Sequence, residues 1–148
     1  GLADLHLHTS YSDGWPSPKE VVDHVTLETD LAVMAITDHD TIEGALRAAE
    51  HSEKISGIPV IIGAEVSSRQ GHILGPFLER RVQPGLSAAA TIQAIQCHSG
   101  LAIACPPVKA SNATFALHAA ECGRLVRFAI FCSISSPHRA VKGSRFST

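Results

Sequence analysis

The feature that most constrains the fold of this chain is a continuous apolar run, Leu31–Thr37, which ends abruptly in Asp38-His39-Asp40. A short run without polar alternation is typical of a strand buried on both faces of a parallel sheet. Helices cover the faces of such a sheet and connect its parallel strands. The run therefore predicts an α/β fold with a buried sheet.

Strand and helix patterns alternate along the rest of the chain, as this fold requires. The expected elements are a strand at Asp4–His8, a helix that starts after the capping residue Ser17, a helix from Thr41 to about Ile55, strands at Ile58–Val66 and Gln70–Gly75, a helix at Ala88–Cys97, a strand at Leu101–Cys105, a helix at about Phe115–Cys122 and a strand at Val126–Ile134. This alternation predicts a parallel α/β sheet or barrel, in which the third and fourth strands could form a hairpin.

The composition indicates one soluble domain over residues 1–148. The chain is 45% hydrophobic and 18% charged, with a net charge of −2, so no bulk charge favours a nucleic acid or an anionic membrane. No apolar run reaches transmembrane length. The four cysteines are widely spaced and are expected to be buried, reduced thiols of a cytoplasmic protein.

The first expected strand carries two histidines with strand spacing. His6 and His8 are two residues apart, so both imidazoles leave the same face of the strand. Asp13-Gly14 follows at an expected turn, from which the carboxylate can curl back toward that face. Two imidazoles and a carboxylate are the start of a metal site. The alternative is that both histidines are half-buried strand residues and that Asp13 only forms the turn.

Other polar residues follow the expected strands in the same way. Asp38, His39 and Asp40 end the second strand, Glu65 closes the third, and His72 belongs to the fourth. In an α/β sheet or barrel, ligands bind at the carboxyl ends of the strands. Buried charges without partners are costly, so such a cluster needs either mutual pairing or a metal ion. Zinc, manganese and iron accept this mixed nitrogen and oxygen set.

These motifs together resemble the polymerase and histidinol phosphatase (PHP) family over about residues 3–107. The segments that carry the resemblance are His6-Leu7-His8-Thr9, Ser12-Asp13-Gly14, Ile36-Thr37-Asp38-His39-Asp40, Gly63-Ala64-Glu65 and Gly71-His72-Ile73-Leu74-Gly75. The resemblance implies a distorted (β/α)7 barrel with a cluster of up to three metal ions at its C-terminal rim. It also implies hydrolysis of phosphoesters by a metal-activated water.

The resemblance further implies a role for each of these residues. His6 and His8 would bind one ion with Glu65, and Glu65 would bridge to a second ion held by His72. Asp13 and His39 would hold a third. Asp38 and Asp40 would orient imidazoles, as residues behind metal ligands commonly do. Glu65, Asp38 and His39 are then the expected catalytic residues, and the expected metal ligands are His6, His8, Asp13, His39, Glu65 and His72.

The sequence departs from the family pattern at two places. The family strand corresponding to Leu101–Cys105 ends in Ala-His-Pro, whereas this chain has Pro106 at the histidine position. Cys105 is adjacent, but strand alternation predicts that its side chain points to the opposite face. The family also has a C-terminal Asp-x-His, and no aspartate follows Asp40 here. Residues 108–148 are therefore expected to be diverged or truncated, and the barrel to be incomplete at its C-terminus.

Three functional interpretations follow. The first is a metal-dependent phosphoesterase that acts on a small phosphomonoester or nucleotide. The second is a non-catalytic metal-binding remnant or interaction domain of the same family. The third is a hydrogen-bonded network without metal. The expected partner is a small phosphorylated substrate. Neither a membrane nor a nucleic acid, other than a nucleotide substrate, is expected, and the sequence does not predict the oligomeric state.

Overall fold

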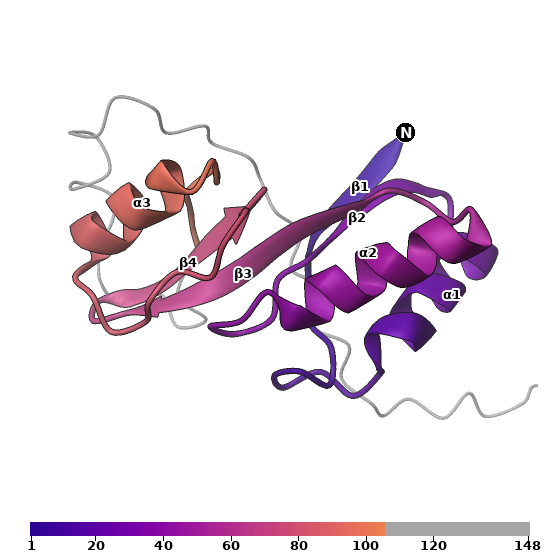
Figure 1. The fold of residues 1–148 in the computed structure, drawn as a ribbon, viewed down its shortest axis with the longest axis horizontal. Helices are drawn as coiled ribbons and strands as arrows, with labels where there is room; N and C mark the ends of the chain where they lie inside the picture. Colours follow the sequence, from indigo (N-terminus) through magenta and orange to yellow (C-terminus); the bar gives the residue numbers. More distant parts are fainter. Residues whose placement is uncertain (106–148) are drawn as a thin grey trace, which may run out of the picture.

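The computed structural model of the chain describes residues 1–105. Its elements are β1 (Leu2–Leu7), α1 (Pro18–Glu28), β2 (Leu31–Ile36), α2 (Glu43–Ile55), β3 (Val60–Ser68), β4 (Gly71–Pro76), α3 (Ala88–Cys97) and β5 (Ile103–Ala104). Each expected element before residue 105 is present (Figure 1). The helix and strand expected at 115–122 and 126–134, and the expected divergence of 108–148, lie outside the described residues.

The described strands form one mixed sheet in the order β1-β2-β3-β4-β5. β1, β2 and β3 pair in parallel, whereas β4 pairs antiparallel with β3 and with β5. The α/β class and the hairpin are confirmed, but a purely parallel sheet is wrong for β4. Only Arg69 and Gln70 separate β3 from β4, and a parallel crossover needs about a dozen residues or more. The structure describes five strands, so the expected (β/α)7 barrel stays a prediction.

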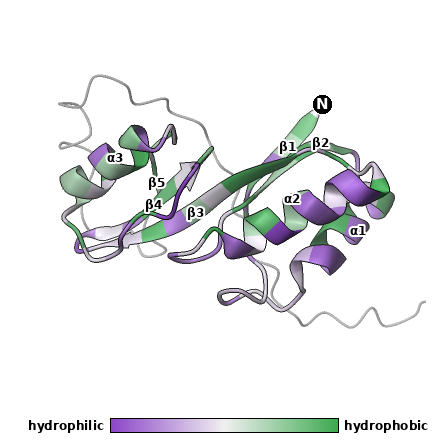
Figure 2. Cartoon of the chain, viewed as in Figure 1, coloured by the Kyte–Doolittle hydropathy of each residue, from purple (hydrophilic) through white to green (hydrophobic). Residues whose placement is uncertain are grey.

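Helices cover the sheet in two places and create two apolar clusters. α1 and α2 lie side by side over the β1–β3 part, and α3 packs on β3 and β4 (Figure 1). Figure 2 shows apolar residues gathered on β2 and on the first part of β3, where the two strands run side by side. The buried members of the first cluster are Val21, Val22, Val25, Met34, Ile36, Ala45 and Ala48. Those of the second are Ile42, Ala64, Val66, Ile73, Leu78, Val82, Ile95 and Ala102. Ile62 of β3 packs against both.

The strand directions bring the polar strand ends to one edge of the sheet. β1, β2 and β3 run in parallel, so their carboxyl ends lie together. The hairpin pairs Ser67 with His72, which places the first residues of β4 at the same edge. β5 reverses direction again and ends there too, where the Cys105 N–H donates to the His72 carbonyl at 3.3 Å. The topology therefore collects residues from all five strands at this edge.

The two N-terminal helices differ in how well their starts were predicted. α1 begins as expected, with Ser17 and Glu20 forming a reciprocal capping box. α2 begins at Glu43 rather than at Thr41, although the Thr41 hydroxyl still accepts the Glu43 N–H at 3.2 Å. α2 starts later than expected because His39 still pairs with Glu65 of β3 in a parallel bridge. The chain therefore stays extended past the end of β2.

Two further expectations can be compared with the structure. Cys97 is exposed, which corrects the expectation that all four cysteines are buried. It is the last residue of α3, whose buried positions are Thr91 and Ile95, and a position two residues from Ile95 faces away from the core. No helix within residues 1–105 is long and apolar enough to cross a membrane.

Candidate metal centre

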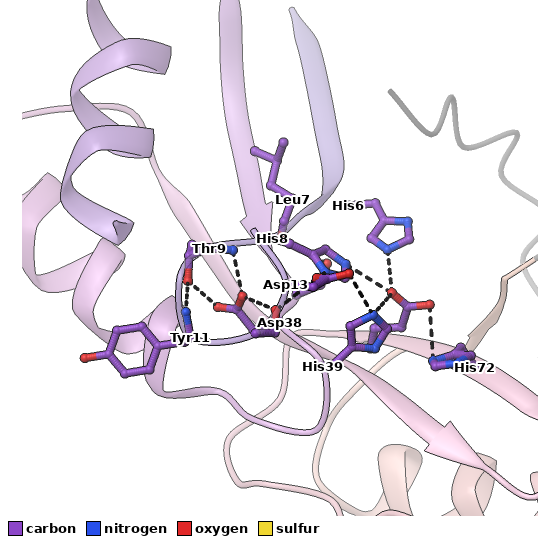
Figure 3. A network of polar contacts seen from close by, with 12 residues as sticks. His6, Leu7, His8, Thr9, Tyr11, Asp13, Asp38, His39 and His72 are labelled. Atoms are coloured by element: carbon purple, nitrogen blue, oxygen red, sulfur yellow. Dashed lines mark hydrogen bonds and ion pairs between the residues drawn. The ribbon is translucent and has the colours of Figure 1, made fainter. Parts of the chain in front are cut away.

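Four imidazoles gather at this edge (Figure 3), and each lies within 3.7 Å of the Glu65 carboxylate. Its Oε2 atom is 2.9 Å from His6 Nε2, 3.0 Å from His8 Nε2 and 3.7 Å from His39 Nε2. Its Oε1 atom is 3.6 Å from His72 Nδ1. The Glu65 residue is only 7% exposed. Four imidazoles from three separate chain segments thus surround one buried carboxylate, and we call these five residues and Asp13 the edge cluster.

Asp13 contacts the imidazoles rather than Glu65. Its Oδ1 atom lies 2.6 Å from His8 Nδ1, and its Oδ2 atom lies 3.6 Å from His39 Nε2. Because Asp13 occupies Nδ1 of His8, that ring presents Nε2 to Glu65, which is the arrangement of a carboxylate orienting a metal-binding histidine. The glycine that follows is needed here, since a Cβ at Gly14 would lie 2.5 Å from the His8 carbonyl.

The close pairing shifts the pKa values of three groups. Burial acts to raise the pKa of Glu65, but hydrogen bonds from His6 and His8 outweigh it and hold that pKa well below its ordinary value. Burial acts to lower the pKa of His8, but its contacts with Glu65 and Asp13 raise it overall. At Asp13, burial again acts to raise the pKa, and the hydrogen bond from His8 lowers it overall. Both carboxylates are therefore ionised at neutral pH and can serve as ligands.

The donor atoms of the edge cluster, together with Cys105, fit a divalent ion. Within residues 1–105, two sets have donor atoms that all lie within 4.8 Å of one another, namely His8, His39 and Glu65, and His6, Glu65 and Cys105. Ligand atoms around a tetrahedral zinc ion are about 3.3–3.8 Å apart. Nitrogen, oxygen and sulfur donors of this kind suit zinc and iron. The two sets share Glu65, and His6 and His8 belong to different sets.

The position of Cys105 corrects the expectation that its side chain faces away. Its sulfur lies among the donor atoms of His6 and Glu65. The alternation argument fails because β5 contains only Ile103 and Ala104, so Cys105 lies beyond the regular strand. The signal for this residue in the sequence is its place beside Pro106, and strand periodicity predicts the wrong direction for its side chain.

Asp38 corrects a second expectation, because its hydrogen bonds hold a loop and not an imidazole. It is fully buried, with 0% exposure. Its Oδ1 accepts the Thr9 N–H and the Ser12 hydroxyl, each at 2.7 Å, and its Oδ2 accepts the Thr9 hydroxyl at 2.7 Å. Figure 3 shows Asp38 and Thr9 together, apart from His6, His39 and His72. Asp38 fixes the 9–14 loop, which carries Asp13.

Asp40 likewise supports backbone rather than an imidazole. Its Oδ1 accepts the Ser67 N–H at 2.7 Å, and its carbonyl accepts Arg81 Nε at 2.7 Å. Its backbone is left-handed, with φ of 56°, where aspartate is one of the better-tolerated residues. Asp40 therefore turns the chain from the parallel bridge at His39 into α2 and ties that turn to β3.

Gly44 allows α2 to approach this buried network. A Cβ at Gly44 would overlap Asp38 Oδ2 and lie 2.7 Å from the Thr9 hydroxyl. We expect Gly44→Ala to lower the free energy of unfolding by about 1–3 kcal/mol, because the added methyl must displace Asp38 or α2. Urea unfolding followed by circular dichroism measures this change. Glu53→Ala, at an exposed position of the same helix, is the control and should stay within about 0.5 kcal/mol. Equal stability of Gly44→Ala and the wild type would show that this approach is not tight.

Comparisons with known proteins give the family. The sequence matches the PHP domain over residues 4–124. An uncharacterized protein of Methanocaldococcus jannaschii is 38% identical over 116 residues, which are 71% of this chain and 67% of that protein. A 3',5'-nucleoside bisphosphate phosphatase of Chromobacterium violaceum is 38% identical over 89 residues, which are 57% of this chain and 30% of the phosphatase.

The fold has a counterpart among solved structures. A two-domain protein of Bacteroides vulgatus, which contains a predicted PHP-like metal-dependent phosphoesterase, superposes with a TM-score of 0.59 at 21% identity. The superposition covers 68% of this chain and 33% of that chain. This chain thus matches only about a third of that protein and of the phosphatase. The match over residues 4–124 spans most of the sequence, and the chain belongs to the PHP domain family.

Proposed function

We propose that the edge cluster binds divalent metal ions and that these ions serve the hydrolysis of a small phosphomonoester or nucleotide. The observation that carries the proposal is the buried Glu65 carboxylate with imidazoles on both of its oxygens. Membership of the PHP family supports a phosphoesterase. The resemblance to a nucleoside bisphosphate phosphatase supports a phosphorylated substrate of nucleotide size.

The ligands proposed for zinc, manganese or iron are His6, His8, Asp13, His39, Glu65 and His72. Glu65 is suited to bridge two ions, because it belongs to both donor sets and has imidazoles near both of its carboxylate oxygens. The two donor sets within 4.8 Å support one ion at His8 and His39 and another at His6. We propose these two sites in place of a shared site for His6 and His8.

The exposure of the side chains supports an open face for substrate. The side chains of His6 and His8 are 12% and 18% exposed, whereas those of His72 and Asp13 are 46% and 67% exposed. A substrate phosphate would therefore approach from the side of His39, His72 and Asp13. Bound ions would there stabilise charge on the phosphate oxygens and lower the pKa of a water. Glu65 and His39 would touch the reacting groups, and Asp38 would act as a positioning residue through the 9–14 loop.

The second candidate function is a non-catalytic metal-binding or interaction domain of the same family. Two sequence features favour it, since the family's Ala-His-Pro is missing after Ile103 and no aspartate follows Asp40. A network without metal is the third candidate. The contacts of His6 and His8 with Glu65, at 2.9 and 3.0 Å, would satisfy all three groups by hydrogen bonds alone.

One experiment separates these candidates. The protein is purified without a polyhistidine tag, its metal content is measured by elemental analysis, and hydrolysis of p-nitrophenyl phosphate and of a nucleoside 3',5'-bisphosphate is assayed with added manganese or zinc. We expect at least one bound ion per chain and metal-dependent release of phosphate. Metal without turnover would favour the non-catalytic domain, and neither metal nor turnover would favour the hydrogen-bonded network.

The matched control for this experiment is His24→Ala. His24 is an exposed residue of α1 and lies on none of the segments that build the edge cluster. We expect its replacement to leave metal content and turnover unchanged. A fall in metal content in this variant would mean that the measured ions bind to surface histidines and not to the edge cluster.

A further inference from the structure

We infer that Cys105 is a metal ligand of the edge cluster and that its thiolate makes the ion site at His6 selective for zinc over manganese. This inference rests on the proposed function, because it concerns one of the two proposed ions. It differs from the ligand set that the family resemblance implies, which has no sulfur donor.

The backbone around Cys105 is held in place by β4. Ala104 pairs with Ile73, and the Cys105 N–H donates to the His72 carbonyl at 3.3 Å. These contacts fix the residue at the end of β5, at the edge where the other ligands meet. The Cys105 residue is half-buried. Its approach to the cluster is therefore set by the sheet and does not depend on a long loop.

The side chain completes a three-donor set. The sulfur of Cys105, a ring nitrogen of His6 and a carboxylate oxygen of Glu65 all lie within 4.8 Å of one another. His6 Nε2 and Glu65 Oε2 are already 2.9 Å apart. Zinc bonds of about 2.3 Å to sulfur and about 2.0–2.2 Å to nitrogen and oxygen require only small side-chain shifts from this arrangement. Three protein donors with a fourth position open are typical of catalytic zinc.

The sulfur donor makes the two proposed sites chemically different. The set of His8, His39 and Glu65 offers only nitrogen and oxygen, which manganese accepts. The set with Cys105 offers a soft thiolate, which favours zinc over manganese. Binding there deprotonates the thiol, and the proton leaves to solvent. The chain would thus hold a zinc-selective site next to a less selective one, joined by the Glu65 carboxylate.

Cobalt substitution tests this inference directly. Co²⁺ added to tag-free protein should give visible d–d absorption and a near-ultraviolet band from sulfur-to-cobalt charge transfer, which only thiolate ligation produces. We expect Cys105→Ser to abolish the charge-transfer band, and to weaken zinc binding at least about tenfold with a smaller change in manganese binding. The matched control, Cys97→Ser at the exposed end of α3, should keep the band and both affinities.

A variant in which Cys105 is the last remaining cysteine tests the same role if Cys105→Ser does not fold stably. Replacing Cys97, Cys122 and Cys132 together by serine leaves only Cys105 and should preserve the band. Loss of the band in that variant, or its persistence in Cys105→Ser, would overturn the role of Cys105. Cobalt d–d absorption without any charge-transfer band would overturn it too while leaving the proposed metal centre intact. Failure of the wild type to bind cobalt, zinc or manganese would overturn the proposed function itself.

Discussion

Replacing Glu65 with glutamine is expected to weaken metal binding by at least about 100-fold, because this carboxylate belongs to both donor sets. Even the loss of a residue that only hydrogen-bonds to a metal ligand lowers metal affinity by about 10–100-fold. Glutamine has nearly the same shape but lacks the negative charge. An ion at 100 times its dissociation constant stabilises the folded wild type by about 2.7 kcal/mol, and the same concentration would stabilise the variant by only about 0.4 kcal/mol. Both ions should be lost together, since both depend on Glu65.

Thermal unfolding with and without zinc measures this effect. The wild type should gain about 5–10 °C in melting temperature at that zinc concentration, and Glu65→Gln about 1 °C. Elemental analysis of the same samples gives the number of ions lost. Glu28→Gln, at an exposed position of α1, should behave like the wild type. Unchanged metal content in Glu65→Gln would refute the bridging role and leave Glu65 as a hydrogen-bond acceptor only.

The fold of residues 1–105 could be predicted where local signals are strong. The apolar run Leu31–Thr37 and the capping residues Ser17 and Glu20 act through sequence neighbours, and both elements appear as expected. The direction of β4 could not follow from the strand–helix alternation alone, because it depends on the short turn at Arg69 and Gln70. The sequence predicts the start of α2 at Thr41, two residues before Glu43, because the bridge between His39 and Glu65 is a contact between distant segments.

The candidate site likewise has a part that could be predicted from the sequence and a part that could not. The polar strand ends predicted that His6, His8, His39 and Glu65 would meet, because the topology of a sheet fixes where strands end. The sequence could not show which oxygen of Glu65 faces which ring, since that depends on side-chain geometry. It also gave no sign that Asp38 turns toward Thr9, and strand periodicity pointed Cys105 the wrong way. Metal-binding motifs thus predict which residues gather, and tertiary packing decides what each one contacts.

Replacing Asp38 with alanine is expected to lower the free energy of unfolding by at least about 3 kcal/mol. The buried carboxylate accepts hydrogen bonds from the Thr9 N–H, the Thr9 hydroxyl and the Ser12 hydroxyl, and a hydrogen bond to a charged group contributes about 1.5–3 kcal/mol. Alanine leaves these donors without their acceptor. Asp38→Asn should lose less, because its amide retains one carbonyl oxygen.

The same variants distinguish loop positioning from direct catalysis. If Asp38 only fixes the 9–14 loop, Asp38→Asn should lower the free energy of unfolding in urea and should weaken metal binding through Asp13, since the orientation of Asp13 against His8 would loosen. Asp30→Asn, at an exposed position before β2, is the matched control and should change neither quantity. A stable Asp38→Asn variant that binds metal normally but fails to hydrolyse p-nitrophenyl phosphate would contradict the loop role. It would instead place Asp38 among the groups that act on substrate.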